Sequence, residues 1–511
     1  MTNTRLMLAA CWILISGQSA SIAQSLQSNP AAGVFDPIAV LRIQSEPLGD
    51  SHSGMFLGSM SCSSASCHGS PRRESALKSA ADYFLKRDRH QLAGTVLYDD
   101  RSQEIAKRLN LTHPWKAQEC LACHAPAAVH VVDREEFDVK LADGVGCESC
   151  HGPSRQWLST HHTTQWKQPE IWSGLNKRQA GFHETKELLT RVNLCADCHV
   201  GNAEQSVTHD LIAAGHPRLT FEYASYQSQM PIHWQRSADR RRSPVANSEP
   251  SADHSTYEAT NWLIGQLVNA EHELDILSAA AVNPDVAWPE LGQYDCIACH
   301  HSLSSSVWRQ SRIAWKLGPG ELPWGTWGLG FVKQLQTHLP DIVSEQFPEG
   351  QNVLGEAVRS MSAGKTETLA SITELRKELA KTTKHLSTAS LSSEDISRLR
   401  QALLNDHEKL TTQGWDRSAQ LYLAAVALDM GFSDARGEGN QIEPSRQDSY
   451  LRLRQLLLLH KKEATSPNRN RQTPDEQNDR QAIRAEFRRI QSQDRPNDDD
   501  AGRTPVSEIE R

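Results

Sequence analysis

Several features are scarce in this chain of 511 residues, and each scarcity excludes a class of structure. Hydrophobic residues make up only 38 % of the sequence, which is little for domains that fill their cores with side chains alone. Beyond residue 16 no uninterrupted apolar run reaches the roughly 20 residues that a membrane-spanning helix needs, so no further span is expected. The formal net charge of -8 argues against nucleic acid as a partner.

Cysteine is absent after residue 299, yet ten of the eleven cysteines lie in five signatures that each end in Cys-His. These read Cys62-Ser-Ser-Ala-Ser-Cys67-His68, Cys120-Leu-Ala-Cys123-His124, Cys147-Glu-Ser-Cys150-His151, Cys195-Ala-Asp-Cys198-His199 and Cys296-Ile-Ala-Cys299-His300. Two thiols at this spacing can bond the two vinyl groups of one porphyrin, and the next residue offers its imidazole to the iron. The sequence therefore predicts five covalently attached haem c groups, numbered here in chain order, with these five histidines as proximal ligands.

The first signature has four residues between its cysteines instead of two, so its loop must bulge for both thiols to reach one haem. Zinc would use Cys/His quartets without requiring a His directly after every second Cys. A thioredoxin-like motif would occur once, at a strand-to-helix turn. Both alternatives fit the sequence poorly.

Residues 1–23 resemble a secretory signal peptide, with Arg5, an apolar stretch over residues 6–16 and a small-residue cleavage site before Gln24. Cys11 falls inside that peptide. Because haem c is attached outside the cytoplasmic membrane in bacteria, a periplasmic or other extracytoplasmic location is predicted.

The rest of the chain divides into four expected regions, and the predicted fold class is mainly α. An extension (24–50) precedes a pentahaem cytochrome c domain (51–330) of short helices and long loops, in which a polar insertion over 235–255 reads as a solvated loop or as a basic docking patch. A helical bundle (331–463) follows, with helices expected over 353–382, 393–412, 415–430 and 446–462 and a capping box at Ser392 and Asp395. Residues 464–511 are predicted to be a disordered polar tail, within which residues 480–490 could form a weak amphipathic helix.

Local sequence around the signatures resembles the tetrahaem cytochrome c-554 family, whose wider relatives include hydroxylamine oxidoreductase and pentahaem nitrite reductase. The resemblance rests on residues 141–153, Leu-Ala-Asp-Gly-Val-Gly-Cys-Glu-Ser-Cys-His-Gly-Pro, on residues 88–93, Asp-Arg-His-Gln-Leu-Ala, and on the order of the first four sites. It extends over roughly residues 55–230. Residues 209–219 and 294–301 are similar to a group of uncharacterised exported multihaem proteins, for which an architecture but no activity is implied.

The sixth iron ligand decides what each haem can do, because a second histidine leaves electron transfer as the natural role. By the resemblance, His90 would serve the third haem and His161 the first, with His162 as the alternative to His161. His209 and His216 are seven residues apart, which on a helix places both on one face and suits two neighbouring haems, one of them the fourth. His52 could serve the fifth or the second haem.

The remaining histidines are expected to have other roles. His301 could serve another haem or bond a propionate, and for His113, His130, His183, His233, His254 and His272 packing, propionate contacts or exposure is the stronger interpretation. His338, His385, His407 and His460 belong to the cysteine-free region.

The resemblance also implies that the second haem, held by His124, lacks a distal protein ligand, although His130 could close it or act as a proton donor. Electron transfer between redox partners is the predicted function. The alternative is an oxidoreductase that acts on a small nitrogen or sulfur compound at one open haem, although no catalytic residues are evident in the sequence. A third possibility is a subunit of a larger respiratory assembly that docks through the C-terminal helices.

Overall fold

The computed structural model describes residues 55–70, 77–131, 133–167, 177–231, 233, 256–284, 286, 288–301, 306–318, 322–339, 365–388, 391–435, 442–459 and 477–493. These residues all belong to one compact unit, Ser45–Arg511. The predicted signal peptide, His52 and the insertion over 235–255 lie outside the described residues.

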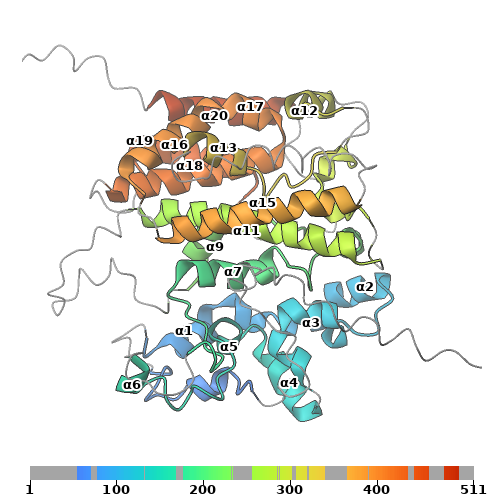
Figure 1. Cartoon of the computed structure of the whole chain (residues 1–511), viewed down its shortest axis with the longest axis vertical. Coiled ribbons are helices and arrows are strands. Elements are labelled where there is room, and N and C mark those ends of the chain that lie inside the picture. Colours follow the sequence, from blue (N-terminus) through green and yellow to red (C-terminus); the bar gives the residue numbers. More distant parts are fainter. Residues whose placement is uncertain are drawn as a thin grey trace, which may run out of the picture. The chain divides into compact units, whose positions relative to one another are not determined.

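The described chain is helical, and its only pairing of extended backbone is an isolated bridge between Tyr294 and Trp324 (Figure 1). The prediction of a mainly α fold with little β-structure is therefore confirmed. No helix in the described ranges is long and apolar enough to cross a membrane.

Short helices dominate the part of the chain that carries the first four signatures. They are η2 (Ser59–Cys62), α1 (Ala80–Arg87), η3 (Arg89–Leu92), η4 (Thr95–Tyr98), α2 (Asp100–Arg108), η5 (Pro114–Lys116), α3 (Gln118–His124), η6 (Pro126–His130), α4 (Arg134–Asp143), α5 (Cys147–His151), α6 (Thr164–Lys167), α7 (Leu188–His199), α8 (His209–Ala214) and α9 (Tyr223–Gln229). Only small apolar clusters accompany them up to α6, such as Leu97 with Leu121 and Leu141. Up to α6 the side chains alone thus form only a modest core, as expected where large cofactors complete the packing.

Longer helices follow. They are α11 (Tyr257–Val282), η8 (Leu291–Gln293), η9 (Cys296–Ala298), α12 (Val307–Trp315), α13 (Val332–His338), α15 (Lys365–Thr388), α16 (Ser393–Asn405), α17 (His407–Thr412), α18 (Trp415–Ala435), α19 (Pro444–Leu456) and α20 (Gln477–Ser492). The helices expected over 393–412, 415–430 and 446–462 correspond to α16 with α17, to α18 and to α19. The expected capping box begins α16: the Ser392 hydroxyl accepts the Asp395 amide, and the Asp395 carboxylate accepts the Ser392 amide.

Helix α11 is the centre of the hydrophobic core. It is buried on nearly all sides because α7, α9, α15 and α18 pack around it, and α15 runs beside it in Figure 1. Helix α11 comes very close to Tyr223 of α9 at Gly265, where glycine has no side chain. A Cβ added at Gly265 would lie only 2.7 Å from the Cβ of Tyr223. The buried Asn269 side chain ties the helix to the segment before α9, since its amide donates to the Phe221 carbonyl at 2.9 Å. One core therefore extends from Val192 to Ile490, across the boundary predicted at residue 330.

Helix α20 lies in the region predicted as a disordered polar tail, and for these residues that prediction is wrong. Polar and charged residues outnumber apolar ones here, but Ile483, Phe487 and Ile490 recur at helical spacing and are buried. They pack towards α16, α17 and α19. The amphipathic helix expected within residues 480–490 is present and is longer than expected.

Candidate haem-binding sites

Four of the five signatures overlap a helical segment. The second, third and fourth signatures end α3, α5 and α7, and the fifth begins with η9. One helical turn separates the two cysteines of a Cys-x-x-Cys pair, so both thiols project from the same side as the following imidazole. This local geometry fits attachment of one porphyrin to each signature.

The longer first signature follows η2, and its extra residues bulge outward as expected. The Ser64 carbonyl accepts the amides of Cys67 and Gly69 at 2.9 Å each, which closes a turn. Ser64 and its two neighbours before Cys67 are exposed. His68 then returns towards the chain, where its Nδ1 lies 2.8 Å from the Leu77 carbonyl oxygen.

Each of four signature histidines lies near a histidine that is remote in the sequence. The ring centroids are 6.1 Å apart for His68 and His161, 6.4 Å for His124 and His216, 6.0 Å for His199 and His90, and 6.5 Å for His300 and His209. An iron bound by two imidazole nitrogens at about 2 Å each places the ring centroids roughly 6 Å apart. The four pairs therefore fit an iron between their rings.

In five of the eight paired histidines the outer ring nitrogen, Nδ1, has a hydrogen-bond partner. Nδ1 lies 3.0 Å from the Ala93 carbonyl in His124, 2.6 Å from the Leu158 carbonyl in His161 and 2.8 Å from the Pro217 carbonyl in His216. Metal-binding histidines usually donate their other ring N–H to such an acceptor, which fixes the tautomer. Nε2 is then left for the iron.

His90 has a charged partner instead of a carbonyl. Its Nδ1 lies 2.8 Å from an Asp88 carboxylate oxygen, and the same oxygen accepts the His90 amide at 3.0 Å. Burial alone would raise the pKa of Asp88, but the hydrogen bonds and charge of His90 lower it below its ordinary value. Asp88 therefore stays ionised and holds the His90 ring in place.

Burial also keeps four of the other rings uncharged. It lowers the pKa values of His124, His161 and His216, and it lowers that of His199 to about 4 with a contribution from the charge of His90. At neutral pH these imidazoles are neutral, which is the state that binds metal.

The third site differs from the other four. Among the described side chains, the ring found at a comparable distance from His151 is Phe182, at 6.4 Å, and no histidine pair of the kind described above includes His151. Burial lowers the pKa of His151 to about 4, and the charge of His233 contributes next. His233 therefore lies near His151, a proximity that the sequence did not indicate.

The structure places the predicted distal ligands as follows. His161 lies beside His68, the expected site, whereas His90 lies beside His199 and not beside His151. His209 lies beside His300 of the fifth signature and His216 beside His124 of the second, and neither is paired with His199 of the fourth. The second site, expected to be open, thus has a histidine ring opposite His124.

The segment from His209 to His216 is not the two-turn helix that its spacing suggested. Helix α8 ends at Ala214 because Gly215 adopts a φ of 124°, which L side chains rarely adopt. The Thr208 side chain begins the helix by accepting the Leu211 amide, and Glu290 accepts the His209 amide at 2.7 Å. A short helix with a histidine just beyond its end directs the two rings to different partners.

Contacts between thiols connect particular sites. The Cys62 thiol lies within hydrogen-bonding reach of the Cys147 thiol, and the Cys123 thiol lies within reach of the Cys198 thiol. The first signature thus meets the third, and the second meets the fourth.

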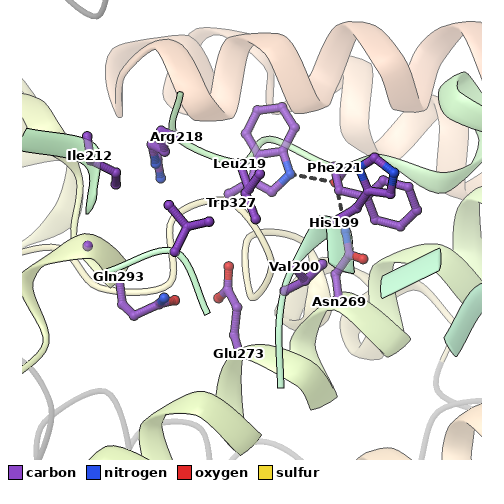
Figure 2. Close-up of a pocket in the computed structure, with 12 residues that line it drawn as sticks. His199, Val200, Ile212, Arg218, Leu219, Phe221, Asn269, Glu273, Gln293 and Trp327 are labelled. Carbon is purple, nitrogen blue, oxygen red and sulfur yellow. Dashed lines mark hydrogen bonds between the residues drawn. The ribbon is translucent and has the colours of Figure 1, made fainter. Parts of the chain in front are cut away.

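A pocket lies between the fourth signature and the segment that leads to the fifth. Figure 2 shows His199, Val200 and Phe221 on one side of it and Ile212, Arg218 and Gln293 on the other. Trp327 and Phe221 are linked there, since the Trp327 indole N–H donates to the Phe221 carbonyl at 2.7 Å. A buried carboxylate, Glu273, also lines this pocket.

Helical fold, Cys-His signatures and paired imidazoles together define the class: a multihaem c-type cytochrome. Residues 61–152 match the family model of cytochrome c554 and c-prime, which covers the first three signatures. The chain thus contains a domain of this family, with covalently bound haem, iron and a role in electron transfer as its implied properties. Neither a curated protein nor a solved structure matches the chain.

Proposed function

We propose that this protein is an exported electron-transfer cytochrome with five covalently bound haem c groups, of which at least four have two histidine ligands. The observation that carries this proposal is the set of four histidine pairs with ring centroids 6.0 to 6.5 Å apart. When bound, the haems supply iron that accepts and releases single electrons. The chain holds each iron between two fixed rings and leaves these four sites no open position for a substrate.

The contacts between sites favour a continuous path for electrons. Thiol contacts join the first site to the third and the second to the fourth. Cys150 of the third signature also lies near Cys195 of the fourth. The segment with His209 and His216 joins the second site to the fifth. The resulting order of the haem sites along the path is first, third, fourth, second and fifth.

The proposal is tested by counting haems and their spin states in the purified mature protein. A pyridine haemochrome assay should give five haems per chain, and the EPR spectrum of the oxidised protein should be dominated by low-spin signals. His161→Ala should convert the first haem to a high-spin species. Its exposed neighbour His162 does not lie opposite a signature histidine, so His162→Ala is the matched control and should leave the spectrum unchanged.

Two results would contradict the proposal. Fewer than five haems per chain would show that one signature is empty, and Cys62→Ala would test whether it is the long first one. An unchanged spin state in His161→Ala would remove His161 as a ligand.

The third site supports a second candidate function, that of an oxidoreductase acting on a small nitrogen or sulfur compound. In the described part of the chain His151 faces no histidine in the manner of the other four, and Phe182 lies at the comparable distance. A high-spin signal in the wild-type protein that shifts on addition of nitrite, hydroxylamine or nitric oxide would favour this function. If the signal is absent and His233→Ala creates it, then His233 closes the third iron and electron transfer remains.

We also propose that the protein is periplasmic or otherwise extracytoplasmic and exchanges electrons with separate donor and acceptor proteins, with the C-terminal helices as a docking element. Cell fractionation combined with N-terminal sequencing of the mature chain tests export. Cleavage is expected before Gln24.

A further inference from the structure

Glu273 is the one carboxylate that lines the pocket beside the fourth site, among the residues that the structure describes. It projects from α11, and Figure 2 shows its carboxylate pointing into the space surrounded by Arg218, Gln293 and Trp327, with His199 on another side of the same pocket. Its exposed fraction is 8 %. A carboxylate in such a place needs a reason, because burying a charge without full compensation is costly.

The hydrogen bonds of Glu273 are incomplete. Its Oε1 accepts the Gly328 amide at 2.9 Å, while Oε2 is buried without a partner. The loop of residues 325–328 lies tightly against it, since a Cβ on Gly328 would be 2.5 Å from the Glu273 carboxyl carbon. One oxygen is therefore held in place and the other is left able to carry a proton.

The charges around Glu273 come from three other parts of the chain, namely α18 and two loops. Arg218 forms two hydrogen bonds of 2.9 Å with Asp416, so its charge is largely compensated. Arg417, next to Asp416 on α18, is buried and its pKa is lowered to about 10 by that burial. Asp295 adds a further negative charge near both arginines. Burial is the main cause that raises the pKa of Glu273 to about 7, and Arg218 offsets only part of it.

We propose that Glu273 is a proton-acceptor site that takes up one proton when the haem held by His199 is reduced. The inference rests on the proposed function, because it needs a haem at the fourth site. Reduction of a haem held by His199 by one electron from the donor protein would remove one positive charge beside the pocket. One proton from water then converts the Glu273 carboxylate to the neutral acid, so the net charge of the region does not change.

Two other glutamates whose pKa is raised to about 7 show why Glu273 is singled out. Glu222 is used as a helix cap, since its carboxylate accepts the amides of Ala224 and Ser225 at the start of α9. Glu271, also on α11, accepts a hydrogen bond from Thr383 and does not line the pocket. Burial raises the pKa of Glu271 to about 7 as well, which makes it a matched control on the same helix.

The experiment uses the intact five-haem protein and its variants Glu273→Gln, Glu273→Asp and Glu271→Gln. Haem content and far-UV circular dichroism are measured first. A wild type with fewer than five haems would contradict the proposed function, whereas variants that keep their haems and their fold report on proton uptake alone. The infrared difference spectrum of reduced minus oxidised protein should then show a protonated carboxyl band in the wild type, in Glu271→Gln and, shifted, in Glu273→Asp. The band should be missing in Glu273→Gln.

Potentiometry gives a second measurement. If each electron taken up by the haem is accompanied by one proton, the reduction equilibrium of that haem changes tenfold per pH unit, or about 59 mV for one electron. This slope applies between the pKa values that the carboxyl group has in the oxidised and in the reduced protein. Around pH 7, Glu273→Gln should lose at least half of the slope that the fourth haem shows in the wild type. A carboxyl band that persists in Glu273→Gln, or an unchanged slope in that variant, would overturn the inference.

Discussion

A carboxylate partner distinguishes His90 from the four paired histidines whose outer nitrogen bonds a backbone carbonyl. Its Nδ1 faces the carboxylate of Asp88 at 2.8 Å, whereas His68, His124, His161 and His216 face backbone carbonyls. A carboxylate draws the ring proton more strongly and makes the imidazole a stronger donor to iron. Stronger donation favours the ferric state, so the fourth haem should have a lower potential than its ligand set alone would give.

We therefore expect Asp88→Asn to raise the reduction potential of the fourth haem. Loss of the Asp88 carboxylate should change the ratio between the affinities of His90 for ferric and for ferrous iron by about tenfold. This change corresponds to about 59 mV for one electron. EPR-monitored redox titration measures the change. Asp82, which pairs with Lys86 on α1, provides the control Asp82→Asn, and an equal shift in both variants would contradict the role of Asp88.

The planes of the paired rings provide a second prediction for individual residues. They are nearly parallel for His68 with His161 and for His300 with His209, at 25° and 22°, and nearly perpendicular for His124 with His216 and for His199 with His90, at 89° and 81°. Ligand planes set how the iron d orbitals split. Two haems should thus give rhombic low-spin EPR signals and two should give highly anisotropic ones. Four signals of one type would contradict these ring orientations.

The signature residues could be predicted from sequence because covalent attachment requires a local pattern. The distal histidines could not be assigned in the same way, since each pair joins residues far apart in the chain. The resemblance directed His90 to His151, but the fold of this chain brings His90 to His199. His233 gave no signal in the sequence, because nothing in its neighbourhood repeats or matches a motif.

Helices with a strong apolar period could be predicted well, and those shaped by a single residue could not. Leu399, Leu403 and Leu404 of α16 repeat at helical spacing and are all buried. In contrast, α8 ends at Gly215, which the spacing of His209 and His216 did not reveal. Helix α20 was underestimated because three apolar residues among many charged ones give a weak signal.

We expect Phe487→Ala in α20 to lower the free energy of unfolding by about 3–5 kcal/mol, the usual range for removing a buried phenylalanine. Phe487 has an exposed fraction of 0 %, and Ile483 and Ile490 flank it in the core. Urea unfolding followed by circular dichroism measures the change. The adjacent Arg488 is 60 % exposed, so Arg488→Ala should leave the unfolding midpoint almost unchanged. Equal midpoints for Phe487→Ala and the wild type would show that α20 does not contribute to the core.

At the scale of the whole molecule, the segment after His216 connects the haem sites to the C-terminal helices. Arg218 follows His216 by two residues and reaches Asp416 at the start of α18 with both terminal nitrogens. The Thr326 hydroxyl also bonds Asp416, so three parts of the chain meet at one carboxylate. Burial alone would raise the pKa of Asp416, but Arg218, Thr326 and Arg417 lower it below the ordinary value of 3.8.

Loss of Arg218 should consequently destabilise the protein, because it leaves the buried Asp416 carboxylate without its main partner. We expect Arg218→Met to cost about 3–5 kcal/mol at neutral pH. In the wild type the Arg218–Asp416 pair contributes its full share to the free energy of unfolding above the pKa that Asp416 has in the unfolded chain. This contribution is lost as the pH falls through the lowered pKa that Asp416 has in the folded protein. The difference between Arg218→Met and wild type should therefore be largest at neutral pH and shrink below about pH 4.

A second substitution separates the charge effect from lost packing. Asp416→Asn in the Arg218→Met background removes the uncompensated charge and should recover part of the lost stability, although Asp416→Asn alone is destabilising because it leaves Arg218 unpaired. Unfolding midpoints of the four proteins across pH measure this coupling. Additive effects of the two substitutions, or a deficit in Arg218→Met that does not depend on pH, would show that Arg218 stabilises this junction through its packing and not through its charge.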